Sequence, residues 1–132
     1  MKRALVFASM IAMLAAPALA TKASAASPAK SCFPVREIDG WRAADARTIY
    51  LRVAQTRYYR LDLGNPCSVL TDKGAHLITQ TTGSDLVCTA ADWDLGAARD
   101  MHGSLPMRCI VKTMTPLSAA EADAIPKEFK PH

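Results

Sequence analysis

Four cysteines carry the best-defined chemistry of this 132-residue chain. Cys32, Cys67, Cys88 and Cys109 lie 35, 21 and 21 residues apart, so no Cys-x-x-Cys pair exists for a thioredoxin-like redox centre or a common zinc site. An even number of cysteines behind an export signal favours two disulfides. Three pairings are possible. We expect Cys67 with Cys88, which bracket one strand-turn-strand stretch, and Cys32 with Cys109, which tie the ends of the domain.

Recognisable catalytic frames are missing from the rest of the chain. The Gly-x-Ser-x-Gly pattern of an activated serine does not occur. His76 and His102 stand alone, and an isolated histidine is usually a surface or hydrogen-bonded residue. The aspartates between residues 85 and 100 lack the pattern of a calcium loop. We therefore assign no catalytic residue, no metal ligand and no cofactor, and leave open whether the protein is an enzyme, with the balance against it.

Two tyrosines and two arginines form a possible ligand-binding surface. Tyr50 and Arg52 fall on the polar face of one predicted strand, and Tyr58 and Arg60 on that of the next. Tyrosine and arginine together can stack against a ring or a base. The same residues also commonly cover the outside of a sheet, so the two interpretations stay open.

The strands that would hold these side chains are the clearest elements of the sequence. Ile49, Leu51 and Val53 alternate with polar residues over 48–53, and the same two-residue period returns over 58–63. Residues 54–57 connect the two strands. Gly64-Asn65-Pro66 ends the second one. The pattern predicts a half-buried β-hairpin.

The remaining segments are shorter. We expect a strand over 35–38, a second hairpin made by 76–82 and 86–88, and a loop or single helical turn over 92–103. Residues 107–114 alternate imperfectly, which is typical of a central strand covered on both sides. Ser118 with Glu121 three residues later is a capping box and predicts a helix over 119–125, before Pro126.

Together these elements predict a mainly β fold. We expect a small antiparallel sheet or partly closed barrel of about five strands, with a short C-terminal helix and two disulfides. Trp41 and Trp93 should be largely buried. The expected core comprises Ile49, Leu51, Val53, Tyr59, Leu61, Leu63, Ile78, Val87 and Val111.

The N-terminus has the features of an export signal. Lys2 and Arg3 precede an apolar stretch, Pro17 interrupts it, and Ala18-Leu19-Ala20 is a small-residue cleavage site. We predict a cleaved signal peptide over 1–20, a flexible linker over 21–31, a disulfide-stabilised domain over 32–126 and a frayed C-terminal tail over 127–132. A second cleavage site lies a few residues after the first. No transmembrane segment remains after cleavage.

The charge balance argues against nucleic acid as a partner. The formal net charge of the whole chain is +4, and removal of the signal leaves two more basic than acidic residues. Arginines gather between 36 and 60, and aspartates gather between 62 and 100. Such blocks either steer a charged partner or, as we favour, pair with each other on the surface.

Several local sequences form a recognisable set. They are Cys32-Phe33 followed by Ile38 and Gly40-Trp41, Thr48-Ile49-Tyr50-Leu51, Tyr59-Arg60-Leu61-Asp62-Leu63 leading to Pro66-Cys67, Val87-Cys88 with Asp92, and Cys109-Ile110-Val111 ahead of Pro116-Leu117. Together they resemble a family of small exported proteobacterial proteins described as domain of unknown function 6491. The resemblance implies export and a compact disulfide-bearing domain. It implies no known activity. The chain departs from some relatives in lacking a lipoprotein signal.

These observations favour a non-enzymatic binding or structural module of the cell envelope, located in the periplasm or secreted. Its partner would be an envelope protein or a small ligand. One alternative is an inhibitor of a secreted hydrolase, whose basic surface the aspartate-rich block would suit. Others are a small periplasmic metal-binding protein or enzyme that uses His76 or His102, and a homo-oligomer formed through an exposed sheet edge.

Overall fold

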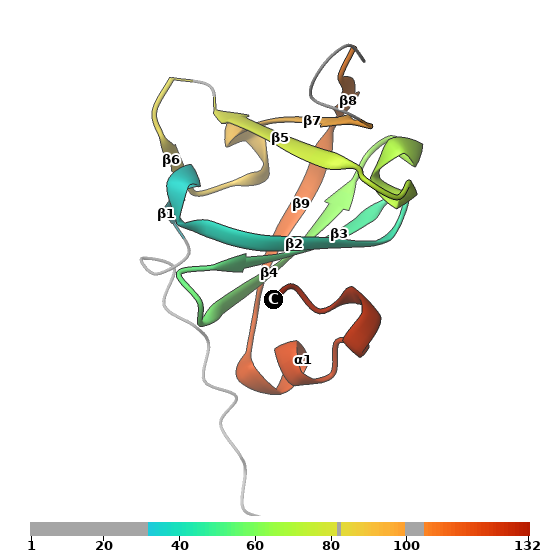
Figure 1. The fold of residues 1–132 in the computed structure, drawn as a ribbon. Helices are drawn as coiled ribbons and strands as arrows, with labels where there is room; N and C mark the ends of the chain where they lie inside the picture. The colour runs from blue at the N-terminus through green and yellow to red at the C-terminus, as the bar shows by residue number, and fades with distance from the viewer. Residues whose placement is uncertain (1–31, 82, 100–104) are drawn as a thin grey trace, which may run out of the picture.

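A computed structural model describes residues 32–81, 83–99 and 105–132, and the fold is mainly β (Figure 1). The expected signal peptide and linker, and His102, lie outside these residues. The largest sheet has four antiparallel strands in the order β2-β3-β4-β9. They are β2 (Ile38–Asp45), β3 (Thr48–Val53), β4 (Arg57–Leu63) and β9 (Val111–Leu117). Within the described ranges, no helix is long and apolar enough to cross a membrane.

Two further sheets and one helix complete the described part of the fold. A three-stranded sheet has the order β5-β7-β8, from β5 (His76–Thr81), β7 (Trp93–Ala98) and β8 (Met107–Cys109). A two-stranded sheet pairs β1 (Phe33–Pro34) with β6 (Leu86–Val87). The helix is α1 (Ala119–Asp123). The predicted β class is thus confirmed, although the described ranges contain nine short strands rather than about five.

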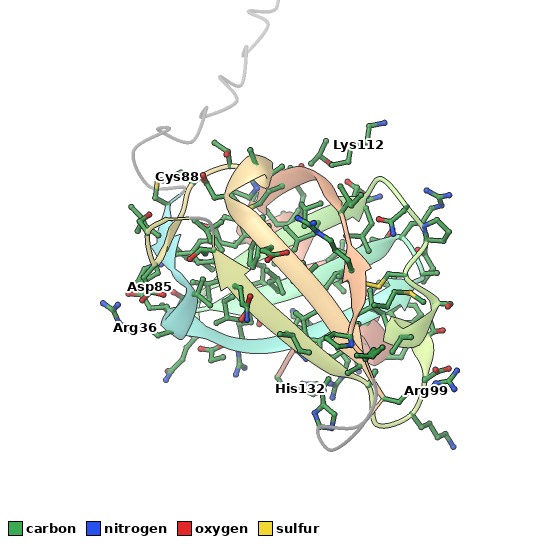
Figure 2. The ribbon with its side chains drawn as sticks, turned by 90° about the horizontal axis from the view of Figure 1, so that it is seen from above. Arg36, Asp85, Cys88, Arg99, Lys112 and His132 are labelled. Atoms are coloured by element: carbon green, nitrogen blue, oxygen red, sulfur yellow. A yellow bond between two sulfur atoms is a disulfide. The ribbon has the colours of Figure 1, made fainter. Side chains whose placement is uncertain are left out.

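The elements form three layers. The three-stranded sheet lies over one face of the four-stranded sheet, as the view from above shows (Figure 2), and α1 lies on the opposite side (Figure 1). The core fills the space between the two sheets. Its fully buried side chains include Ile49, Leu51 and Leu61 from the four-stranded sheet and Leu95 from β7. Phe33 joins them, with its ring centroid 4.7 Å from that of Tyr59.

The β3–β4 hairpin is confirmed with the predicted alternation. Thr48 pairs with Asp62 and Val53 with Arg57, so the apolar positions of both strands share the inner face. The connection is tight because Ala54 and Gln55 adopt positive φ values of 47° and 66°. Trp93 is buried as expected. Trp41 is only half-buried. Ile78 is also half-buried, because β5 turns Leu77 rather than Ile78 toward the core.

The prediction of one central strand over 107–114 is wrong. The chain makes two strands there, separated by Ile110, and each is the edge of a different sheet. The cause is the turn after β4. The carbonyl of Ile110 accepts a hydrogen bond from the Gly64 backbone at 2.8 Å, and the Ile110 N–H donates to the Asn65 side chain at 2.8 Å. These bonds hold residue 110 against the turn, so the chain crosses directly from one sheet to the other.

The predictions of a loop over 92–103 and of a second hairpin are also wrong in part. Residues 93–98 form β7, which pairs with β5 from His76 opposite Ala98 to Thr81 opposite Trp93. Strand β6 pairs with β1 instead of β5. Similarly, residues 35–37 form a 3-10 turn, η2 (Val35–Glu37), and the strand begins at Ile38.

Both disulfides form, but with pairings other than those expected. Cys32 pairs with Cys88, and Cys67 pairs with Cys109. The first pairing follows from the β1–β6 register, in which Phe33 lies opposite Val87, so the next residues outward are also opposite each other. The second follows from the turn after β4, which is held beside residues 108–110 by the Asn65 bonds to the Arg108 carbonyl and the Ile110 amide.

The C-terminal helix is confirmed, whereas the tail is packed rather than frayed. Ser118 and Glu121 make the predicted capping box, with the Ser118 amide donating to the Glu121 carboxylate at 2.7 Å. Residues 127–129 form the 3-10 turn η5 (Lys127–Phe129), and Pro131 is fully buried. A Cβ at Gly40 would lie 2.7 Å from the carbonyl oxygen of His132, so the tail approaches β2 where only glycine fits.

Candidate functional site

The structure brings the tyrosine and arginine residues of the predicted ligand-binding surface together. Tyr50 lies opposite Arg60, and Arg52 lies opposite Tyr58, as two cross-strand pairs of β3 and β4. All four are on the outer face of the four-stranded sheet, because their neighbours Leu51 and Tyr59 are buried on the inner face. The alternation of the sequence was therefore sufficient to predict this juxtaposition.

Intramolecular contacts occupy much of this surface. Arg52 donates to Asp39 at 2.7 Å and Arg60 donates to Asp62 at 2.9 Å; these hydrogen bonds are the main reason that the pKa of each guanidinium is raised. The ammonium of Lys130 lies 5.6 Å from the centre of the Tyr58 ring. A pocket of about 250 Å³ remains, lined by Tyr50, Arg60, Leu117, Glu121, Ala124 and Ile125.

The aspartates of the second charge block have partners within the chain. Asp72 accepts from Arg99 at 2.6 Å, and Asp85 accepts from Arg36 at 3.1 Å at one end of the molecule (Figure 2). The remaining described aspartates between 62 and 94 are similarly engaged: Asp62 by Arg60, Asp92 by the Cys88 and Thr89 amides, and Asp94 by Arg108. This pairing leaves little free negative charge to attract a basic enzyme.

The metal and general-base candidates do not converge in the part of the chain that is described. His76 is exposed on β5, and no three side chains of histidine, cysteine, aspartate or glutamate are grouped as ligands among residues 32–81, 83–99 and 105–132. Asp92 has a structural role. The backbone amides of Cys88 and Thr89 donate to its carboxylate at 2.9 and 2.7 Å, which lowers the pKa of Asp92.

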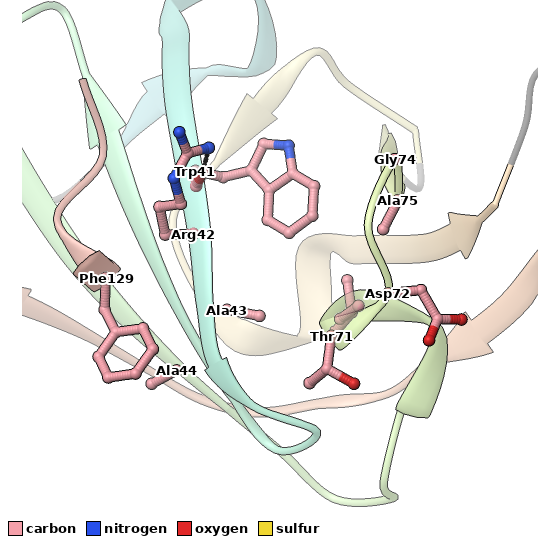
Figure 3. A pocket seen from close by; sticks show the side chains of 10 residues that line it. Trp41, Arg42, Ala43, Ala44, Thr71, Asp72, Gly74, Ala75 and Phe129 are labelled. Atoms are coloured by element: carbon pink, nitrogen blue, oxygen red, sulfur yellow. Dashed lines mark hydrogen bonds between the residues drawn. The ribbon is translucent and has the colours of Figure 1, made fainter.

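Another concave surface lies elsewhere, along the edge of β2. One pocket of about 330 Å³ is lined by Trp41, Arg42, Ala43, Ala44, Leu70, Thr71, Asp72, Gly74, Ala75 and Phe129 (Figure 3). A neighbouring pocket of about 250 Å³ is lined by Val35, Ile38, Asp39, Gly40, Trp41, Leu77 and Thr79. Trp41 belongs to both pockets, so together they follow β2 along its length. We call them the β2–β5 groove.

The groove lies where the two larger sheets separate. Strand β2 is one edge of the four-stranded sheet and β5 is one edge of the three-stranded sheet, and residues of both strands line the groove. On the other side of the molecule the sheets are joined through β8 and β9. The first pocket also passes around the edge of β2, since Trp41 and Phe129 lie on opposite sides of that strand (Figure 3).

The sequence did not reveal this groove. The pairing of β2 with β3 is interrupted by register shifts between Ile38 and Gly40 and between Ala43 and Asp45, so β2 lacks the regular alternation of β3. Phe129 lies in the segment predicted to be a frayed tail. The local signal for Trp41 was its aromatic size, which suggested burial in the core rather than a position at an open edge.

The fold and groove define a small, disulfide-linked β domain with an open side between two edge strands. The chain belongs to DUF6491, a family of unknown function, whose model matches residues 1–130. Neither the curated proteins nor the solved structures contain a match to this chain.

Proposed function

We propose that this protein is an exported, non-enzymatic binding protein of the cell envelope, and that the β2–β5 groove is its binding surface. The observation that carries the proposal is the groove itself, where two strand edges border a shared concave surface. Two disulfides support export, because they form and persist in oxidising compartments. The predicted signal peptide over 1–20 supports the same location.

A rigid scaffold makes this surface suitable for binding. Leu70 at the groove wall is buried, and it follows Cys67, which is joined by a disulfide to Cys109 of β8. A preformed site loses less conformational entropy when a ligand binds than a flexible one does. Ligand sites are commonly concave and partly apolar with a few polar groups, a composition that Trp41, Phe129 and Arg42 provide here.

Native mass spectrometry tests the proposal. The protein is purified without reductant from the compartment to which it is exported, and native and denatured masses are compared. We expect a mass increment that is present only under native conditions. Ala75→Leu, which fills the groove, should remove it, whereas Ala91→Leu, the same change at an exposed alanine outside the groove, should retain it.

Two results would contradict the proposal. One is a wild-type protein whose native and denatured masses agree. The other is an increment that survives Ala75→Leu. An increment equal to one more chain would instead identify a homodimer, and loss of that dimer in the Ala75→Leu variant would place the second copy in the groove.

A further inference from the structure

The backbone of β2 presents hydrogen-bonding groups to the groove. The Leu63 N–H donates to the Arg47 carbonyl at 2.7 Å, just before β3 begins. Because backbone groups alternate in direction along a strand, the odd-numbered residues of β3 direct theirs to β4. Even-numbered residues of β3 therefore face β2. Trp41 and Ala43 lie opposite the odd-numbered Leu51 and Ile49, so their backbone groups point away from β3 and into the groove.

These groups have no backbone partner among the described residues. Within residues 32–81, 83–99 and 105–132, the only hydrogen bond to this stretch of β2 beyond its pairing with β3 comes from the Arg42 side chain, which donates to the Trp41 carbonyl at 3.2 Å. The Trp41 N–H and both backbone groups of Ala43 remain available. An exposed strand edge of this kind is a template for one more strand.

The arrangement of the sheets leaves space for that strand. The chain passes from the three-stranded to the four-stranded sheet at Ile110, but β2 and β5 on the opposite side do not pair. The pocket residues advance from Thr79 and Leu77 to Ala75 as β2 advances from Ile38 to Ala44. The two edges are thus antiparallel with a groove between them. An extended polypeptide added to β2 at the ordinary strand spacing of about 4.8 Å would lie along this groove.

Charges at the groove indicate the character of the occupant. Its carboxylates are already engaged, Asp39 by Arg52 and Asp72 by Arg99. Arg42 is exposed on the outer face and has no carboxylate partner among the described residues. A peptide side chain beside β2 on that face would lie next to this guanidinium. An acidic side chain there would form the charge-assisted hydrogen bonds that arginine makes with carboxylates.

We propose that the β2–β5 groove binds an extended polypeptide segment that pairs with β2 as an additional strand and places an acidic side chain beside Arg42. This inference rests on the proposed function and names the class of its ligand. Main-chain hydrogen bonds to the groove-facing groups of residues 41 and 43 provide affinity, and the apolar wall and Arg42 provide selectivity.

Selection from a random nonapeptide library on the oxidised full chain tests the inference. We expect enriched peptides to alternate apolar and polar residues and to carry aspartate or glutamate at one polar position. Ala43→Pro removes the groove-facing N–H while leaving the β2–β3 hydrogen bonds in place, and proline is tolerated on strand edges. It should weaken binding of the selected peptides at least tenfold. Ala43→Val, which keeps the N–H, should change affinity less than threefold.

Two further measurements do not depend on how well that variant folds. Single N-methyl groups placed along one selected peptide should weaken binding to the wild-type protein with a two-residue period, because backbone amides of a strand alternate in direction. Arg42→Glu should weaken the acidic peptides at least tenfold and improve versions in which lysine replaces the acidic residue.

The outcomes separate this inference from the proposed function. Failure to enrich any peptide would overturn the inference, and the native mass increment would still decide whether the groove binds something else. Peptides that bind equally well to Ala43→Pro and after N-methylation would show side-chain recognition without strand addition. That result would also overturn the inference while leaving the groove as a binding surface.

Discussion

Loss of the Cys67–Cys109 disulfide should destabilise the fold more than loss of Cys32–Cys88. The two bonds span 42 and 56 residues, so chain entropy alone gives each a stabilisation of about 4 kcal/mol, with the longer loop favoured by only about 0.3 kcal/mol. Burial reverses that order. Cys67 and Cys109 are 0% and 2% exposed, whereas the other pair is half-buried.

The expected magnitudes follow from these two contributions. Changing both Cys67 and Cys109 to alanine also removes two buried sulfur atoms, which costs about 1 kcal/mol for each methylene-sized group. The total is about 6 kcal/mol, against about 4 kcal/mol for the double alanine variant at Cys32 and Cys88. A small domain has a net stability of about 5–15 kcal/mol, so the first variant should be close to unfolded.

Urea unfolding followed by circular dichroism measures the difference. With a slope of about 2 kcal/mol per molar urea, the midpoints of the two variants should fall by about 3 M and 2 M. A peptide map under non-reducing conditions first establishes the pairing. A Cys67–Cys88 peptide would refute the structural assignment, and a Cys32/Cys88 variant that is the less stable of the two would refute the reasoning from burial.

Three other changes probe separate parts of the molecule. Gly40→Ala should release the C-terminal residues, because its Cβ would lie 2.7 Å from the backbone oxygen of His132. Faster amide exchange at the C-terminal residues would show this release. Gly64→Ala is the control, because its Cβ has no neighbour closer than 3.8 Å. Asp92→Asn should flatten the acid limb of the stability curve. The folded state lowers the pKa of this carboxyl, so its contribution to stability is full above the ordinary pKa of about 4 and is lost as the pH falls through the lowered pKa. A difference in urea midpoint between the variant and the wild type that is the same at pH 5 and at pH 2 would contradict this. Leu61→Ala should cost about 2–5 kcal/mol in thermal or urea unfolding, whereas Leu105→Ala, at a 94% exposed side chain, should stay within about 0.5 kcal/mol.

Local patterns succeeded where an element is specified by its own residues. The hairpin of β3 and β4 has an uninterrupted two-residue period, and its inner residues are buried as that period requires. The capping box at Ser118 and Glu121 begins a helix because both hydrogen-bonding partners are three residues apart. In each case the stabilising contacts lie within about fifteen residues of each other.

Patterns with weak local preference were misread. Strand β7 contains Gly96, Ala97 and Ala98, residues with low β propensity, yet Trp93, Leu95 and Ala97 alternate inward. That alternation was a signal that could have predicted the strand. Residues 107–114 present the reverse case. Their near-continuous pattern gives no sign that hydrogen bonds from the distant turn after β4 interrupt them at Ile110.

The sequence by itself determined the class of fold, the inner face of the main hairpin, the start of the C-terminal helix and the presence of two disulfides. Each of these depends on residue type and short-range spacing. Tertiary structure decided which cysteines pair, where the chain passes between sheets and how Trp41 and Phe129 come to line one groove. Those outcomes depend on contacts between segments tens of residues apart, whose free energies no local pattern records.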